Sequence, residues 1–248
     1  MVCMAFSPDY KYMVTGCSGG SIAVWDLETK KVQPEIPEAH SNVIKKLLIT
    51  EDNTKIISLS ELEIRIWDLY TCERLYEISN LNTEDGYLSM AYDKNSGNLV
   101  FSQGQDIFVH NITTYKEIQH LKDAHNGDTR AVITTPTGII VSGSEDGSVA
   151  FWEMNSRKLL RRLDGIHKGS INSLVCDHDG NYVFSASSDG SIGVIELEQM
   201  ALKYREKSLN DKSIKFMTLT PDGQYLVSLS KRGHIEYLKL KQKLFSHI

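Results

Sequence analysis

A short pattern that returns six times along the chain constrains the fold more than any other feature. An apolar β-branched or aromatic residue is followed by Ser or Thr at Thr15, Ser58, Ser102, Ser142, Ser185 and Ser228. Successive copies lie 43, 44, 40, 43 and 43 residues apart. A fixed period of this length indicates a repeat architecture, in which each copy is one supersecondary unit that buries its apolar face against its neighbours.

Each copy predicts four consecutive β-strands. The first strands are expected at residues 3–7, 44–50, 88–92, 131–135, 171–176 and 214–220. A polar turn and a second strand with the recurring Ser or Thr follow, and the third strands are expected at residues 22–25, 64–67, 107–110, 149–152, 192–195 and 235–238. A more polar fourth segment closes each copy, the last of them at residues 242–247, and such charge suits an outer edge strand. We therefore predict an all-β fold, with a single domain over residues 1–248.

The fourth copy contains the clearest hairpin of the chain, at residues 141–152. Asp146-Gly147 joins two β-rich runs, and an Asp-Gly pair in that place favours a tight turn because Gly adopts positive φ without strain. The second run ends at Trp152.

The bulk composition excludes several classes of function. A net charge of −5 and an isoelectric point near 5.9 argue against direct nucleic-acid binding, which is typical of basic surfaces. Without an apolar run of about 18 residues, membrane insertion is not expected either. The four cysteines, Cys3, Cys17, Cys72 and Cys176, are scattered, which predicts free thiols in a reducing compartment. We expect a cytoplasmic protein, and a nuclear location fits the same composition.

Tryptophan and histidine positions carry a resemblance to a known family. The third strands of copies one, two and four end in Trp25-Asp26, Trp67-Asp68 and Trp152-Glu153. His40, His125 and His167 stand 18, 17 and 18 residues before the recurring serine of their copies. This combination resembles the WD40-repeat family along the whole chain, and the resemblance implies a β-propeller of four-stranded blades around a central channel.

The resemblance also implies a buried hydrogen-bond network inside each blade. The fourth copy has all four members, His125, Ser142, Asp146 and Trp152. In the implied arrangement the carboxylate accepts from the imidazole, the hydroxyl bridges and the indole N–H donates. The second copy has Glu61 at the place of the aspartate, and copies three and six depart furthest from the pattern.

The number of blades and the closure of the ring stay open at this stage. Six copies are compatible with a closed six-bladed ring, with an open ring that takes a blade from a partner, or with a seven-bladed propeller that lacks one repeat. Some members of the family are open and take a blade from a partner, and the family most often closes with seven blades.

The network residues also resemble catalytic groups. His125, Ser142 and Asp146 offer a Ser/His/Asp set, but a nucleophilic serine must be exposed beside oxyanion donors, and here it is expected under Trp152. We predict no catalytic residue, no metal and no cofactor.

Binding is instead expected on the loops, as in WD40 propellers generally. The candidate partner-binding residues before the first strands are Lys45, Tyr87, Arg130, Asn172 and Lys215. Those between the second and third strands are Glu145, Lys231 and Arg232. With Glu61, Glu63, Glu84 and Asp85, the mapping predicts an acidic sector in the second and third copies and a basic one in the sixth.

The sequence therefore predicts a non-catalytic scaffold that holds other proteins in a multi-subunit assembly. One alternative is a substrate-receptor subunit of a ubiquitin ligase, although Leu27-Glu28 and Leu69-Tyr70 follow the Trp-Asp pairs where many such receptors have Arg at the second position. Another, from a different class, is a propeller hydrolase.

Overall fold

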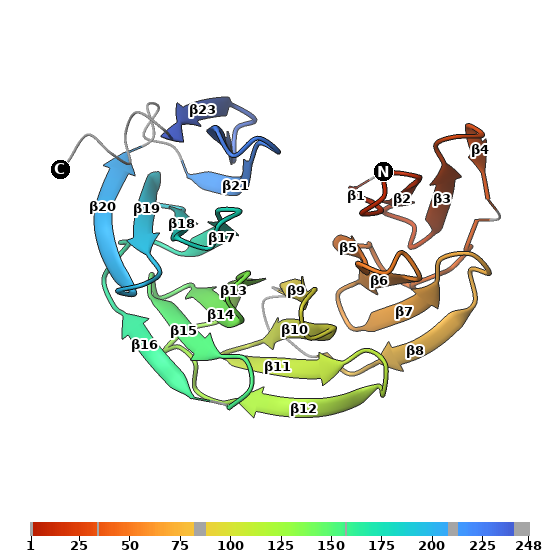
Figure 1. Ribbon diagram of the computed structural model, residues 1–248, viewed down its shortest axis with the longest axis horizontal. Helices are drawn as coiled ribbons and strands as arrows, with labels where there is room; N and C mark the ends of the chain where they lie inside the picture. Colours follow the sequence, from red (N-terminus) through yellow and green to blue (C-terminus); the bar gives the residue numbers. More distant parts are fainter. Residues whose placement is uncertain (1, 34, 82–87, 157, 208–212, 241–248) are drawn as a thin grey trace.

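The computed structural model of the chain describes residues 2–33, 35–81, 88–156, 158–207 and 213–240. These residues form 23 strands in six antiparallel sheets, and the predicted all-β class is confirmed. Strand order within every sheet follows the chain, so each repeat folds as one meander. We call these sheets blades 1 to 6 (Figure 1).

The first three blades have four strands each. Blade 1 contains β1 (Cys3–Phe6), β2 (Tyr12–Gly16), β3 (Ile22–Asp26) and β4 (Lys31–Val32). Blade 2 contains β5 (Lys46–Ile49), β6 (Lys55–Leu59), β7 (Ile64–Asp68) and β8 (Arg74–Ile78). Blade 3 contains β9 (Met90–Asp93), β10 (Asn98–Gln103), β11 (Asp106–Asn111) and β12 (Lys116–Leu121).

The last three blades repeat this order. Blade 4 contains β13 (Thr129–Thr134), β14 (Ile139–Ser144), β15 (Val149–Glu153) and β16 (Leu159–Leu163). Blade 5 contains β17 (Ile171–Cys176), β18 (Tyr182–Ser187), β19 (Ser191–Glu196) and β20 (Ala201–Lys207). Blade 6 contains β21 (Ile214–Leu219), β22 (Tyr225–Ser230) and β23 (Ile235–Lys239).

The predicted first and third strands agree with the observed ones to within two residues at either end. In β7 the alternation has its physical basis in burial, because Ile64 and Ile66 are buried and Arg65 between them is partly exposed. The predicted outer strand at residues 242–247 lies outside the described residues.

Apolar side chains gather between blades rather than within them. The described core falls into five clusters, and each joins two consecutive blades. Between blades 1 and 2, for example, Val14 and Val24 pack with Leu47 and Trp67. Because a single sheet cannot bury both of its faces, each blade depends on its neighbours for a core.

The six blades form an open arc, with the innermost strands on the concave side (Figure 1). Blade 6 and blade 1 are its two ends and lie apart. Among the described strands, extensive contacts join consecutive blades but not blade 6 to blade 1. The closed six-bladed ring is therefore not the arrangement that the chain adopts.

The ends of the arc explain the exposure of Trp25. Trp67 and Trp152 face the preceding blade and are 5% exposed, whereas Trp25 in blade 1 is 36% exposed. Apolar side chains are also exposed on blade 6, where Phe216, Ile235 and Tyr237 have more than half of their surface in solvent. Within the described residues no helix has the length and apolar character needed to cross a bilayer.

Candidate partner-binding face

In blades 2, 4 and 5, a buried histidine connects the loop before the inner strand to the second strand of the same blade. In blade 5, His167 Nε2 lies 2.8 Å from Ser185 Oγ, and its Nδ1 lies 2.8 Å from Ser191 Oγ. Ser191 in turn donates to Asp189 Oδ1 at 2.6 Å. The hydroxyl of Ser191, which follows the turn glycine, thus bridges the Asp189 carboxylate and the His167 imidazole. We call this arrangement a His–Ser relay.

The same relay occurs in blade 4 and corrects the predicted network. His125 lies 2.8 Å from Ser142 Oγ through Nε2 and 2.7 Å from Ser148 Oγ through Nδ1. Asp146 accepts from Ser148 at 2.6 Å, so the aspartate reaches the imidazole through a hydroxyl. The predicted indole hydrogen bond is wrong, because Trp152 Nε1 is buried without a partner among the described residues.

Blade 2 has the direct form of the network. His40 lies 2.8 Å from Glu63 Oε1 and 2.6 Å from Ser58 Oγ, and Trp67 Nε1 donates to the same hydroxyl at 2.8 Å. The carboxylate is Glu63 and not the predicted Glu61, which pairs with Lys45 at 3.5 Å. The predicted acidic sector is also wrong for Glu63, because its carboxylate turns inward to His40 and Arg65.

Burial sets the protonation of these histidines. Removal from water lowers the pKa of His125 and of His167 to about 4, because the charged imidazolium is poorly solvated inside the sheet. Ser142 is fully buried beside His125. A buried hydroxyl cannot meet a substrate, and these groups join strands to loops.

The inner strands of blades 4, 5 and 6 share a backbone irregularity at one end. The register of β13 with β14 shifts at Arg130, that of β17 with β18 at Asn172, and that of β21 with β22 at Lys215. No such shift occurs between the first two strands of blades 1, 2 and 3 in the described residues. A β-bulge turns one side chain away from the regular alternation, so three blades aim a polar residue at the same side of the arc.

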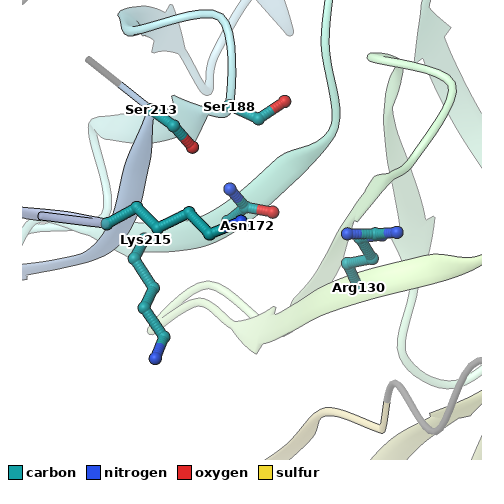
Figure 2. A pocket seen from close by; sticks show the side chains of 6 residues that line it. Arg130, Asn172, Ser188, Ser213 and Lys215 are labelled. Atoms are coloured by element: carbon teal, nitrogen blue, oxygen red, sulfur yellow. The ribbon is translucent and has the colours of Figure 1, made fainter.

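These bulged residues line a pocket that we call the basic pocket. It has a volume of about 240 Å³ and is lined by Arg130, Asn172, Ser188, Ser213, Lys215 and Lys231. In Figure 2, Arg130 lies across the pocket from Ser213 and Lys215. Four of the eight predicted binding residues, Arg130, Asn172, Lys215 and Lys231, thus come together here.

Hydrogen bonds hold the two sets of loops around the basic pocket. Lys231 N donates to Ser213 O at 2.9 Å, and Ser188 N donates to Ser170 O at 2.8 Å. Asn172 Nδ2 donates across the blade boundary to Ile214 O at 2.8 Å. The pocket therefore rests on backbone contacts of blades 5 and 6 rather than on long side chains alone.

Arg130 and Glu145 form the rim of the basic pocket on blade 4. Arg130 Nη2 lies 2.7 Å from Glu145 Oε1. The guanidinium side chain is 14% exposed, whereas the carboxylate side chain is 42% exposed. Glu145 therefore orients Arg130 from the more exposed side of the pair.

A larger cavity of about 780 Å³ continues from this pocket along the concave side of the arc, and the two share Asn172 and Lys215. Residues in or directly before the inner strands of all six blades line it, among them Lys45 and Lys46. Lys46 Nζ donates to Met90 O at 2.7 Å, and burial lowers the pKa of its ammonium group to about 8. Among the residues that the structure describes, neither cavity has an Asp or Glu in its lining.

The remaining predicted residues are placed elsewhere. Lys45 lines the larger cavity and pairs with Glu61. Arg232 is exposed beside Lys231 but does not line the basic pocket. Tyr87 lies outside the described residues, as do Glu84 and Asp85 of the predicted acidic sector.

Sequence reasoning missed four serines. Ser148 and Ser191 each follow an Asp-Gly pair, so the repeated Asp-Gly-Ser triplet is a signal that could have found both relays. Ser188 and Ser213 line the basic pocket, and nothing in their local sequence distinguishes them from ordinary loop serines.

Comparison with known proteins agrees with this geometry. The family model described as "WD domain, G-beta repeat" matches residues 1–26, 115–153 and 157–195. Its last two matches cover β12 to β15 and β16 to β19, where two complete His–Ser relays lie. The chain is a WD40-repeat β-propeller protein.

Curated WD40-related proteins match over most of the chain. The "Serine-threonine kinase receptor-associated protein" of Gallus gallus is 27% identical over 175 residues, covering 71% of this chain and 49% of its own. The "Histone acetyltransferase type B subunit 2" of Candida glabrata is 23% identical over 202 residues, covering 73% and 48%. "WD repeat-containing protein 41" of Mus musculus is 25% identical over 154 residues, covering 51% and 33%.

This chain spans about half the length of the first two relatives. In its described part, no group of three or more His, Cys, Asp or Glu side chains is placed to hold a metal ion. A smaller cavity of about 150 Å³ lies beside Asn95 and Pro136.

Proposed function

We propose that this WD40 protein is a non-catalytic scaffold that binds a protein partner through the loop face around the basic pocket. The observation that carries the proposal is the convergence of three bulged residues, Arg130, Asn172 and Lys215, from three consecutive blades. Bulges are typical of places where a sheet re-aims side chains for function. Loops held on a rigid scaffold are common sites of binding.

The relatives support the same class of function. One is named as a receptor-associated protein and another as a subunit of an acetyltransferase, and both names describe association with other proteins. We extend only that general role, membership of a multi-subunit assembly, to this chain. We also propose a cytoplasmic location, supported by the four unpaired cysteines.

Neither alternative function has an observation in its favour. A hydrolase would need an accessible nucleophile, and Ser142 of the catalytic-looking set is fully buried. The role of a ubiquitin-ligase receptor predicts association with ligase adaptor proteins, which the experiment below would reveal by their presence among the captured proteins.

Affinity purification with quantitative mass spectrometry tests the proposal. The bait is the full chain, compared with the double variant K215Q/K231Q, which removes two positive charges from the basic pocket. The matched control is K11Q/K94Q, which removes two exposed lysines from turns at the other end of the inner strands. We expect a set of proteins captured by the wild type and by the control but lost with the pocket variant.

The result that would contradict the proposal is an identical set of captured proteins with all three baits. Equal thermal denaturation midpoints of the three baits would show that a loss of capture does not come from unfolding. Because both lysines of the pocket variant are exposed, their substitution is expected to change the stability by less than about 0.5 kcal/mol.

A further inference from the structure

The charge of the basic pocket is opposite to that of the whole chain. The net charge of the protein is −5, yet among the described residues the pocket lining contains Arg130, Lys215 and Lys231 and no carboxylate. Glu145 on the rim neutralises part of the charge of Arg130. Neither Lys215 nor Lys231 forms an ion pair with another described residue. The pocket therefore has an excess of about two positive charges over its immediate surroundings.

The donors around the pocket also favour an anion. Ser188 and Ser213 add two hydroxyl groups to the lining that contains Lys215 and Lys231. The carboxylate of Glu145 reaches Arg130 but does not line the pocket. A ligand with several acceptor oxygens would satisfy more of these groups than a ligand with one or two.

The size of the pocket limits what it can hold. Its volume of about 240 Å³ lies below the range of about 300–1,000 Å³ that is typical of sites for small molecules and cofactors. It opens onto loops rather than into a closed core, as the turns and strand ends in Figure 2 show. One charged side chain of a larger partner fits these dimensions better than a whole cofactor does.

We infer that the basic pocket receives a phosphorylated serine or threonine side chain of the protein partner. This inference rests on the proposed function and names the chemistry of the bound segment. A phosphomonoester carries about −1.5 to −2 charges at neutral pH and three acceptor oxygens, which match the excess of two cations and the hydroxyl donors. A glutamate or aspartate would bring one charge and two oxygens, and one lysine would remain uncompensated.

The position of Arg130 adds a geometric reason. Its guanidinium is already held by Glu145 at 2.7 Å, so a bound phosphoryl group would meet a preoriented donor. Ordering a flexible side chain costs conformational entropy on binding, and that cost falls when a neighbour has already fixed the side chain. The two lysines act as point charges, whereas Arg130 provides direction.

An oriented peptide library tests the inference. Three fluorescently labelled pools differ only at a fixed central position, which is phosphoserine, serine or glutamate, and fluorescence anisotropy measures their binding to the full chain. We expect the phosphoserine pool to bind at least about tenfold more tightly than the other two, because the phosphoryl group brings more negative charge and a third acceptor oxygen for charge-assisted hydrogen bonds.

Single variants connect this preference to the pocket. Lys215→Gln and Lys231→Gln are each expected to weaken binding of the phosphoserine pool by about tenfold. Arg232→Gln is the matched control, since Arg232 is an exposed neighbour of Lys231 outside the pocket lining. We expect it to change the affinity by less than about twofold, as is usual for a screened surface charge.

Each outcome decides between the inference and the function on which it rests. Equal binding of the phosphoserine and glutamate pools would overturn the inference in favour of any acidic side chain. A second result would also overturn the inference: the wild type sediments with phosphoinositide vesicles, K215Q/K231Q does not, and the library shows no preference for phosphopeptides. The pocket would then be assigned to lipid headgroups. If K215Q/K231Q loses captured proteins but the library shows no preference for phosphate, the inference fails and the proposed scaffold function stands.

Discussion

A single hydrogen bond distinguishes two blades whose sequences contain the same motif residues. Blade 2 and blade 4 both contain the His, Ser and Trp of the motif, and both tryptophans are 5% exposed. Trp67 donates to Ser58, whereas Trp152 Nε1 has no partner among the described residues. The energetic role of the tryptophan therefore differs between the two blades.

Replacing each tryptophan by phenylalanine separates packing from hydrogen bonding. Trp67→Phe is expected to lower the free energy of unfolding by about 1 kcal/mol more than Trp152→Phe, because it alone removes a hydrogen bond. Urea unfolding monitored by circular dichroism measures both losses. Equal losses would show that the indole of Trp67 contributes through packing alone.

The buried histidines predict how stability depends on pH. The pKa of His125 and of His167 falls from 6.5 in the unfolded chain to about 4 in the fold. Between these values the unfolded chain binds protons that the folded chain does not. Stability is therefore complete above about pH 6.5 and decreases as the pH falls toward 4.

Removing one of these imidazoles should reduce this pH dependence. In His167→Asn, the free energy of unfolding between pH 6 and pH 4.5 should fall less steeply than in the wild type, by up to about 1.4 kcal/mol per pH unit. Urea unfolding at several pH values measures the slope, and the exposed His178→Asn is the control for losing a surface imidazole. An unchanged slope would mean that His167 is charged in the folded state.

At the scale of the elements, turn glycines connect consecutive blades. The turn between β14 and β15 contains Gly147 at φ +79°, and the carbonyl oxygen of Gly147 accepts from His167 N at 3.3 Å. Gly20 and His40 make the equivalent contact at 2.9 Å between blades 1 and 2. A Cβ on Gly147 would lie 2.4 Å from His167 O, so both the backbone conformation and the close approach require glycine.

Gly138 allows these two requirements to be separated. It has nearly the same φ, +78°, but a Cβ there would meet nothing within 4 Å. Gly138→Ala should cost about 1–2 kcal/mol through the left-handed backbone alone, and Gly147→Ala should cost about 1–3 kcal/mol more through the clash with His167 O. Urea unfolding of both variants gives the difference, and equal costs would show that blades 4 and 5 shift apart freely.

At the scale of the whole molecule, the open arc makes the blades unequal. Blades 2 to 5 pack against two neighbours through the five apolar clusters, whereas blades 1 and 6 each pack against one. The exposed Trp25 and Phe216 belong to the outer faces of these end blades. In a repeat protein, stability is approximately the sum of the repeats and of the interfaces between neighbours.

Amide hydrogen exchange should therefore be faster at the two ends of the arc. We expect amides of β2 and β22 to exchange before those of β10 and β14, because local opening of an end blade breaks one interface instead of two. Mass spectrometry of peptic fragments measures the order of exchange in the full chain. Uniform protection of all six blades would indicate that the ends are covered in solution.

The sequence by itself determined the repeat, the strands and the class of fold. Strand positions were predictable because alternation, turn glycines and the His, Ser and Trp positions are local signals with a fixed period, as in residues 141–152. The same signals predicted that Ser142 lies next to His125. Ser142 lies on the second strand and His125 in the loop before the first strand, and the repeat pattern makes these two segments neighbours.

Only the tertiary structure decided which residues form a site and how the arc ends. The positions of Arg130, Asn172 and Lys215 before the inner strands made them candidates from the sequence, but only the tertiary structure shows that each is a bulge and that the three line one pocket. The choice of Glu63 over Glu61 depends on which carboxylate the turn directs inward. The six blades form an open arc (Figure 1). Its opening depends on the rotation between each pair of neighbouring blades, added along the chain, and the sequence of a single repeat does not encode that total.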